Sequence, residues 1–491
     1  MANPEHLKFL LAGGWDEWRR ANPRILPDLV DADLRGMDLS GKDLSRAVMT
    51  RVDLEGSSLA GANLTLAQFE GARLEGTVFD GADCTGVRLD LLELRTCSFK
   101  GTTFTGATFR GSDLTGCMLS GAVLAQVNLE GAVLDRADLS GADLSGAGLR
   151  GCRIERANLT GATLVGTMLE GVSMSGNDLK GANLEGAYAL RAQFPGANLE
   201  GARLLKANVR EANFLRANLG GANCEWADFT HATLRAANLE EARFVNADLS
   251  QADLREAILL NAVFDEVQMT GANLSGLDLR SPRLGRVLLV RANLSGTILN
   301  RCNLRTARLE QARLEGADLR GANLESANLD GAYLSGAELR ETRLRKASMV
   351  GAVLADADIS GCDLIMANLS RANCTRADFR FTRLVGADCS RADFRWADLR
   401  KADFSRGVLS GANLWGARVM GTVLPVASLH WKLILGLSAL FVEARRKREE
   451  KLKREQARRI RDTVRLVQEL EEKDPRLRRL RSAGEVRRPP A

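Results

Sequence analysis

The chain has 491 residues, of which 26% are charged and 5% are aromatic, and its formal net charge is +6. This charge excludes a strongly acidic or strongly basic protein, and the length is sufficient for a large buried core. The three histidines (His6, His231 and His430) are not spaced with cysteines or carboxylates as a metal site or a nucleophilic set. Because phosphate-binding loops and serine elbows are also absent from the sequence, we expect a protein that is not an enzyme and needs no cofactor.

Residues 1–27 predict an N-terminal helical cap. One face of a helix would collect five apolar side chains ahead of two prolines, namely Leu7, Leu10, Leu11, Trp15 and Trp18 before Pro23 and Pro27. Glu5 and Lys8 interrupt the apolar stretch, which therefore lacks the pattern of a secretory signal. We expect a cytoplasmic bacterial protein.

A five-residue period dominates residues 28–428. Every fifth residue from Leu34 to Leu429 is of a buried type, and these 80 central positions hold 54 Leu and 13 Phe. The residue two positions before each of them is small, usually Ala. This period matches neither a helical face, which repeats every 3.6 residues or so, nor a strand face, which repeats about every 2.

A short extended segment followed by a corner explains this period. In extended backbone the small residue and the central residue point to the same side, while the residue between them, such as Asp33, points outward. The other two residues must turn the chain, and 39 of the 47 Gly lie two residues after a central position, where Gly tolerates the backbone angles of a corner. Such segments wind into a solenoid in which each coil contacts only its neighbours.

Runs such as Ala62-Asn63-Leu64 and Ala397-Asp398-Leu399 resemble the pentapeptide-repeat family. The resemblance extends from Asp31 to about Leu429 and implies an all-β solenoid, the right-handed quadrilateral β-helix, with four repeats per coil. The 80 repeats would then form about 20 coils, and a spacing of about 4.8 Å between coils predicts a rod of roughly 95 Å. The functions of this family are diverse, so the resemblance specifies the fold more than the function.

Two places depart from the pattern. Ala189 stands at a central position, where its small side chain predicts a bulge or a cavity. Near residues 277–289 the small position holds Leu277 and then Pro282. The charge also changes sign there, from −10 over residues 31–280 to +7 over residues 281–430, so we expect a coil of different cross-section between an acidic and a basic part of the rod.

The nine cysteines are all predicted to point inward, four at central positions and five at small positions. A buried cysteine behaves as a small hydrophobe. Cys97 and Cys117 are 20 residues apart and should stack on successive coils, but a reducing cytosol disfavours a disulfide between them.

Two segments complete the chain as a C-terminal α-helical extension. Residues 429–442 are largely apolar but shorter than the roughly 20 residues that span a membrane, which leaves a capping helix or an interfacial membrane anchor. Residues 443–491 carry a net charge of +8 and predict a basic helical tail, disordered at its end. This tail is either a solvated helix or an element that binds a partner or nucleic acid.

The function we expect is an interaction scaffold for a protein partner, with the basic tail serving docking or localisation. One face of the basic part of the rod carries a stripe of cations with a net charge of +5, and three outward aromatics (Tyr333, Trp396 and Trp415) are predicted to lie near it. Tryptophan and arginine are favoured at binding hot spots. The candidate partner-binding residues are therefore Arg283, Arg286, Arg305, Arg343, Arg345, Lys346, Arg383, Trp396, Arg406, Trp415, Arg445, Arg446, Lys447 and Arg448.

Two other functions stay open. Some members of the resembled family protect DNA gyrase by presenting an acidic rod that mimics DNA. The −10 charge of residues 31–280 is, however, far below the roughly 35 negative charges of a comparable duplex. Alternatively, the tail binds nucleic acid or an anionic membrane electrostatically. By analogy with family dimers that join through C-terminal helices, a homodimer is a further expectation.

Overall fold

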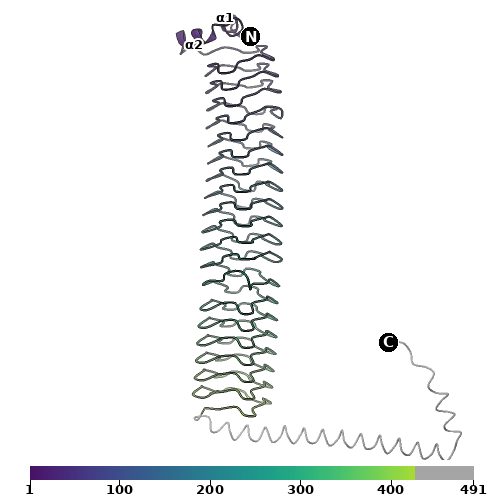
Figure 1. The fold of residues 1–491 in the computed structure, drawn as a ribbon, viewed down its shortest axis with the longest axis vertical. Helices are drawn as coiled ribbons and strands as arrows, with labels where there is room; N and C mark the ends of the chain where they lie inside the picture. Colours follow the sequence, from purple (N-terminus) through teal and green to yellow (C-terminus); the bar gives the residue numbers. More distant parts are fainter. Residues whose placement is uncertain (426–491) are drawn as a thin grey trace, which may run out of the picture.

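The computed structural model describes residues 1–425. Two helices, α1 (Pro4–Ala12) and α2 (Trp15–Ala21), precede a long rod of stacked coils (Figure 1). The coils pair through single-residue parallel β-bridges, which run from Asp28↔Val48 to Asp403↔Val423 and always join residues 20 positions apart. Each coil therefore consists of four five-residue repeats, as the resemblance implied.

The same backbone hydrogen bonds recur from repeat to repeat. In the repeat centred on Leu34, the Leu34 N–H donates to the carbonyl of Asp53 on the next coil (2.8 Å), and the Asp53 N–H donates back to Ala32 (2.9 Å). A third bond closes the corner, where the Met37 N–H donates to the Leu34 carbonyl (3.2 Å). Because the first two bonds join successive coils, each coil is stabilised by its neighbours alone.

The corners adopt the left-handed backbone conformation that glycine tolerates. The 39 glycines at corners have φ between +61° and +76°, and another 38 corners place a different residue at positive φ, for example Asn246 at +58°. Holding a residue other than glycine in this conformation costs about 1–2 kcal/mol. The register of the coil, rather than the presence of glycine, therefore determines the corner conformation.

Replacing a corner glycine with valine should destabilise the rod through backbone strain. A Cβ at Gly201, where φ is +64°, would meet no atom within 4 Å, but a β-branched residue is strongly disfavoured at such a φ. We expect Gly201→Val to lower the free energy of unfolding in urea by about 1–2 kcal/mol. The matched control is Gly148→Val, since Gly148 also faces open space but lies at a bridge position without positive φ. Equal losses in both variants would show that corner strain is not the cause.

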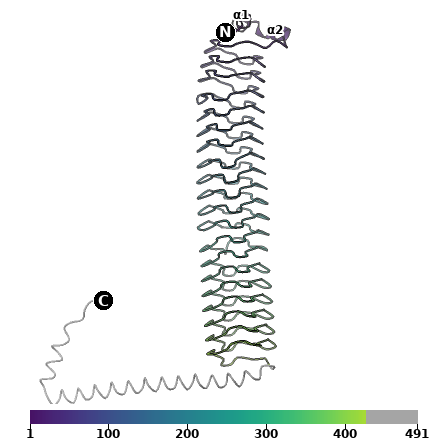
Figure 2. The same cartoon turned by 180° about the vertical axis from the view of Figure 1, so that it is seen from behind.

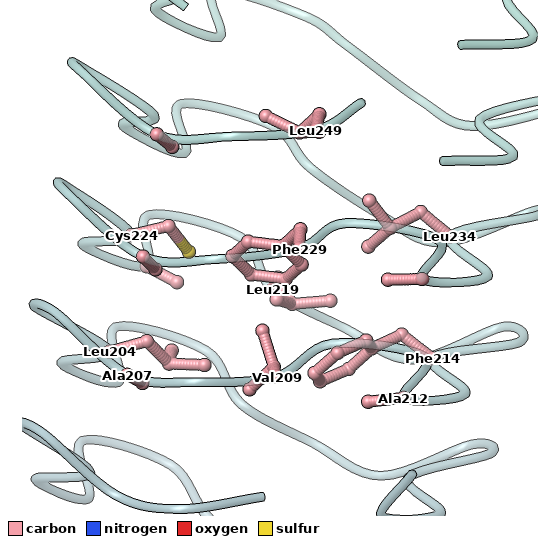
Figure 3. Packing of buried hydrophobic residues seen from close by; sticks show 14 of the residues in the cluster. Leu204, Ala207, Val209, Ala212, Phe214, Leu219, Cys224, Phe229, Leu234 and Leu249 are labelled. Carbon is pink, nitrogen blue, oxygen red and sulfur yellow. The ribbon is translucent and has the colours of Figure 1, made fainter. Parts of the chain in front are cut away.

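Leucine and phenylalanine fill the interior of the rod. Figure 3 shows Val209, Phe214 and Phe229 pointing into the space enclosed by successive coils. Phenylalanines that are 20 residues apart stack on one another, and the rings of Phe194 and Phe214 lie within 2° of parallel with their centroids 4.8 Å apart. The central positions therefore form continuous apolar columns along the rod.

The nine cysteines are buried free thiols, which confirms that they point inward. The Sγ atoms of Cys97 and Cys117 donate to the carbonyls of Leu74 and Leu94, at 2.9 and 2.7 Å. Burial raises the pKa of Cys97 to about 12. These thiols therefore stay protonated and pack as small core side chains.

The N-terminal cap is formed by two helices, so the prediction of one helix with a continuous apolar face is wrong. Gly13 and Gly14 separate α1 from α2, and their φ angles of +88° and +90° break the helix. Trp15 is buried, and its indole N–H donates to the carbonyl of Asp43 at 2.9 Å, whereas Leu11 is exposed. The two helices lie over the first coils at the end of the rod (Figure 2).

The bulge predicted at Ala189 is wrong. The Ala189 N–H donates to the carbonyl of Asn208 (2.7 Å), and the bridges of Tyr188 to Met168 and to Asn208 continue the ladder past it. Since this ladder joins backbone groups, a shortened side chain leaves the register unchanged. The alternative of a cavity stays a prediction.

The coil near residues 277–289 does differ from the others. Three bridges are missing from the series that joins residues 20 apart between Asp28 and Val423, namely Arg73–Glu93, Ile258–Asp278 and Arg283–Asn303. Two of the three fall in this region, where the stacking in Figure 1 is visibly less regular. The different cross-section expected here is observed as an opening of the ladder.

The apolar segment 429–442 and the tail 443–491, which includes the candidate cations 445–448, lie outside the described residues. The capping helix, the membrane anchor, the basic helix and the homodimer stay predictions. Within residues 1–425 the structure contains no helix long and apolar enough to cross a membrane.

Candidate interaction surfaces

The outward Asp and Asn residues that precede central positions are used by the repeat itself. Asn63 accepts a hydrogen bond at Oδ1 from the Thr65 N–H (3.1 Å) and donates through Nδ2 to Asp43, one coil earlier (3.2 Å). Asn218 donates to Asn198 in the same way at 3.0 Å. These columns therefore stabilise corners and coil stacking, and they are not candidates for acid–base chemistry.

The predicted cations share one side of the rod. Arg343 and Arg383 belong to a single bridge column in which Asp363 lies between them. Positions that are multiples of 20 apart fall on the same edge of the coil, so three cations stand together at the corner that ends this side: Arg286, Lys346 and Arg406. The eight predicted cations within residues 1–425 are all exposed.

Half of these eight cations are already paired with carboxylates. Among the described residues no ion pair involves the other four, Arg283, Arg343, Lys346 and Arg406. An exposed pair contributes little to stability but lowers the charge presented to a partner. The observed pairs are Arg286–Glu266, Arg305–Glu325 at 3.8 Å, Arg345–Asp363 at 3.9 Å and Arg383–Asp363 at 3.4 Å.

The aromatics do not lie near this stripe, and that part of the prediction is wrong. Trp396 and Arg406 are ten residues apart, which is half a coil, so they occupy opposite corners. Tyr333 and Arg343 lie on opposite sides for the same reason. The structure thus divides the predicted site into two surfaces.

A separate surface forms around the tryptophans. The indole rings of Trp396 and Trp415 meet edge to face with their centroids 4.5 Å apart, and the two residues are 50% and 63% exposed. Lys401 stands one repeat after Trp396, on the next corner, and its ammonium lies 5.0 Å from the centroid of the exposed Phe381 ring. We call Phe381, Trp396, Lys401, Trp415 and the exposed Met420 the tryptophan surface.

Gly416 positions the Trp396 ring. A Cβ added at Gly416 would lie 2.4 Å from Cε3 of Trp396, so the indole occupies the space that a side chain would need on the next coil. The Trp396 N–H also donates to the Trp415 carbonyl at 3.1 Å. An exposed ring that is held in this way loses little conformational entropy on binding.

Phe381 and Met420 were not among the predicted binding residues. Phe381 lies two residues after the central Phe379, at a corner that elsewhere holds mostly Gly or polar residues. Met420 likewise follows the central Val419. A large apolar residue just after a central position is therefore the sequence signal that could have identified both.

Arginines two residues after an aspartate hold the carboxyl pKa low. The pKa of Asp33 is about 2, below its usual 3.8, because the Arg35 side chain donates hydrogen bonds to it and the Arg35 N–H adds another. The pKa of Asp253 is lowered by Arg255 in the same arrangement. The carboxylates of these pairs are ionised at neutral pH.

The resistance of the rod to urea should fall as the pH is lowered from about 4 to about 2. These carboxyls have a lower pKa in the folded chain than in the unfolded chain. Their contribution is therefore complete above the unfolded pKa and is lost as the pH falls through the folded pKa. Each exposed pair contributes little, and the effect sums over many pairs. A urea midpoint that stays constant down to about pH 2.5 would contradict this origin.

Comparison with known proteins follows the repeat. A family model described as pentapeptide repeats matches segments from residues 28–65 to residues 387–424, and its two longest gaps, 92–96 and 282–287, fall where the ladder opens. No curated protein sequence matches the chain.

Three solved structures illustrate the similarity. HetL, a pentapeptide repeat protein involved in heterocyst differentiation regulation from the cyanobacterium Nostoc sp. strain PCC 7120, is 31% identical, with 42% of this chain and 91% of HetL covered and a TM-score of 0.23. The pentapeptide repeat protein Rfr23 from the cyanobacterium Cyanothece 51142 is 28% identical over 23% of this chain and 63% of its own, with a TM-score of 0.14. A trypsin-treated form of QnrB1, a plasmid-mediated fluoroquinolone resistance protein, is 17% identical over 52% of this chain and 88% of its own, with a TM-score of 0.18.

Proposed function

Because the chain belongs to the pentapeptide-repeat family, we propose that it is a non-enzymatic scaffold whose rod binds a protein partner. The fold of this family is the right-handed β-helix solenoid, and its members are generally structural or binding proteins. The tryptophan surface carries the proposal, since it places two half-exposed indoles together on the final described coils.

The composition of this surface favours a protein partner. Tryptophan dominates binding hot spots because it buries a large area and loses few rotamers. Salt-bridged arginines supply a polar rim, with Arg395–Asp393 at 2.7 Å and Arg400–Asp398 at 2.6 Å. An apolar centre within a polar rim is the usual arrangement of a protein interface.

The basic side of the rod would act as a second, electrostatic contributor. The cations without an ion pair among the described residues would steer an acidic region of the partner, which increases the association rate more than the affinity. The basic tail would add docking or localisation in the cytoplasm. A homodimer through the C-terminal segments belongs to the same proposal.

Mimicry of DNA is the less favoured alternative. DNA presents unpaired phosphates at a high density, whereas carboxylates of the acidic part are bound by neighbouring arginines, as in Asp33–Arg35 and Asp253–Arg255, both at 2.7 Å. This pairing lowers a charge that is already too small for a duplex.

A pull-down from the native host tests the scaffold. The full chain is compared at low and high salt with a chain ending at Val442 and with the variant Trp396→Ala/Trp415→Ala. A protein retained at high salt and lost from the tryptophan variant supports the proposal, because apolar contacts resist salt. Recovery of only nucleic acid or lipid, lost at high salt and with the tail, would replace the scaffold with an electrostatic binder.

A further inference from the structure

Two repeats share an unusual pattern. Leu92 and Leu277 occupy the small position, and each is followed four residues later by a hydroxyl residue at the corner, Thr96 or Ser281. These are the two corners between residues 31 and 421 without positive φ. In the same repeats two bridges of the ladder are missing, namely Arg73–Glu93 and Ile258–Asp278.

The leucine and the hydroxyl explain the opening together. A leucine in place of alanine needs more room inside the coil, which separates that side from the coil before it. At ordinary corners the N–H donates to a backbone carbonyl of the next coil. Here the Gly76 N–H donates to Thr96 Oγ1 (2.8 Å) and the Asn261 N–H donates to Ser281 Oγ (2.9 Å). The hydroxyls thus replace acceptors that the opened ladder has lost.

Pro282 extends the second opening into a cleft. The bridge between Arg283 and Asn303 is absent, so among the described residues the N–H groups of Leu284 and Asn303 lack their ladder acceptors. The resulting cleft has a volume of about 400 Å³. Water can hydrate the carbonyls of Pro282 and Asn303, which lose their ladder donors at the same place.

Three guanidinium groups line the cleft. Arg280 is held by Asp278, with Nη2 at 2.6 Å from the carboxylate. Arg283 and Arg301 form no ion pair or side-chain hydrogen bond among residues 1–425. The cleft therefore combines two free guanidinium groups with free backbone N–H donors, which is the donor set that binds oxyanions.

We propose that the cleft at Ser281–Gly285 is a binding site for an oxyanion, the phosphate or carboxylate group of a small ligand or of an acidic peptide. Arg283 and Arg301 would hold the oxygens, and the N–H groups of Leu284 and Asn303 would complete the site. This inference is independent of the tryptophan surface, which lies on coils more than 90 residues further along the chain.

Isothermal titration calorimetry on the full chain at constant ionic strength tests the site. Inorganic phosphate and succinate are the two probes, and they distinguish a phosphate from a carboxylate ligand. We expect saturable binding of at least one probe, weakened by at least about tenfold in Arg283→Ala/Arg301→Ala through the loss of charge-assisted hydrogen bonds. The matched control is Arg343→Ala/Arg406→Ala, which removes two exposed arginines that are unpaired among the described residues but lie outside the cleft.

A second variant separates the shape of the cleft from its charge. Leu277→Ala/Pro282→Ala restores the usual small residue at both positions and keeps every arginine, so it should close the ladder and abolish binding. The proposal is overturned by the absence of saturable binding of both probes, by equal weakening in the control, or by unchanged binding in this variant. The basic tail is present in all of these proteins and cannot produce the differences.

Discussion

Replacing Phe214 with alanine should lower the free energy of unfolding by about 3–5 kcal/mol. Phe214 is fully buried, and its ring contacts those of Phe194 and Phe229 at centroid distances of 4.8 and 5.5 Å. The hydrogen-bonded ladder fixes the separation of the coils, so the walls cannot collapse into the space that the ring leaves. The loss is measured by denaturant unfolding followed by circular dichroism.

The matched control is Phe381→Ala, the same substitution at a residue that is 57% exposed. This variant should lose less than about 1 kcal/mol. Hydrogen exchange should place the effect of Phe214→Ala in the coils next to residue 214, because each coil contacts only its neighbours. Equal losses in the two variants, or faster exchange spread evenly along the rod, would refute this account of the core.

The fold was predictable because one period carries several independent constraints. A small residue, an outward residue and a central Leu or Phe specify an extended side, and Gly two residues later specifies the corner. The structure confirms both in the bridges that join residues 20 apart and in the positive φ of the glycines. Even a wrong side chain at the centre, Ala189, leaves this register unchanged, since the ladder is formed by the backbone.

Features that depend on single residues were less predictable. The helical period of the first 21 residues continues through Gly13 and Gly14, so periodicity alone did not show that the helix breaks there. Leu277 and Pro282 were recognised as irregular, but the cleft also depends on the loss of hydrogen bonds between coils. Such losses follow from the spatial register, which the sequence pattern does not display.

The division of the predicted site into two surfaces was accessible from arithmetic. With four repeats per coil, a separation of ten residues places two side chains on opposite sides, and Tyr333 and Arg343 differ by ten. The net charge of a face was a poorer guide, because half of its predicted cations are neutralised by carboxylates on the same or the next coil.

Removing both indoles with Trp396→Ala/Trp415→Ala should weaken binding of the protein partner by at least about 30-fold, the loss of about 2 kcal/mol or more that marks a hot spot. The rings are positioned before binding by Gly416 and by each other, so their truncation removes contact area without releasing an ordering cost. The effect should appear mainly as faster dissociation, because steering charges remain. Surface plasmon resonance with the purified partner measures both rates.

Trp226→Ala is the matched control for this surface. Trp226 is 59% exposed and stands at a corner with φ of +59°, close to the +62° of Trp396, but it lies on a different corner of the coil in the acidic part of the rod. Its truncation should change the affinity by less than about twofold, as expected for a residue outside the contact. Equal weakening in Trp226→Ala and in the double variant would indicate a general response to lost surface tryptophan. An unchanged affinity in the double variant would move the partner-binding site to the basic side, where Arg343→Ala/Arg406→Ala would then be the decisive measurement.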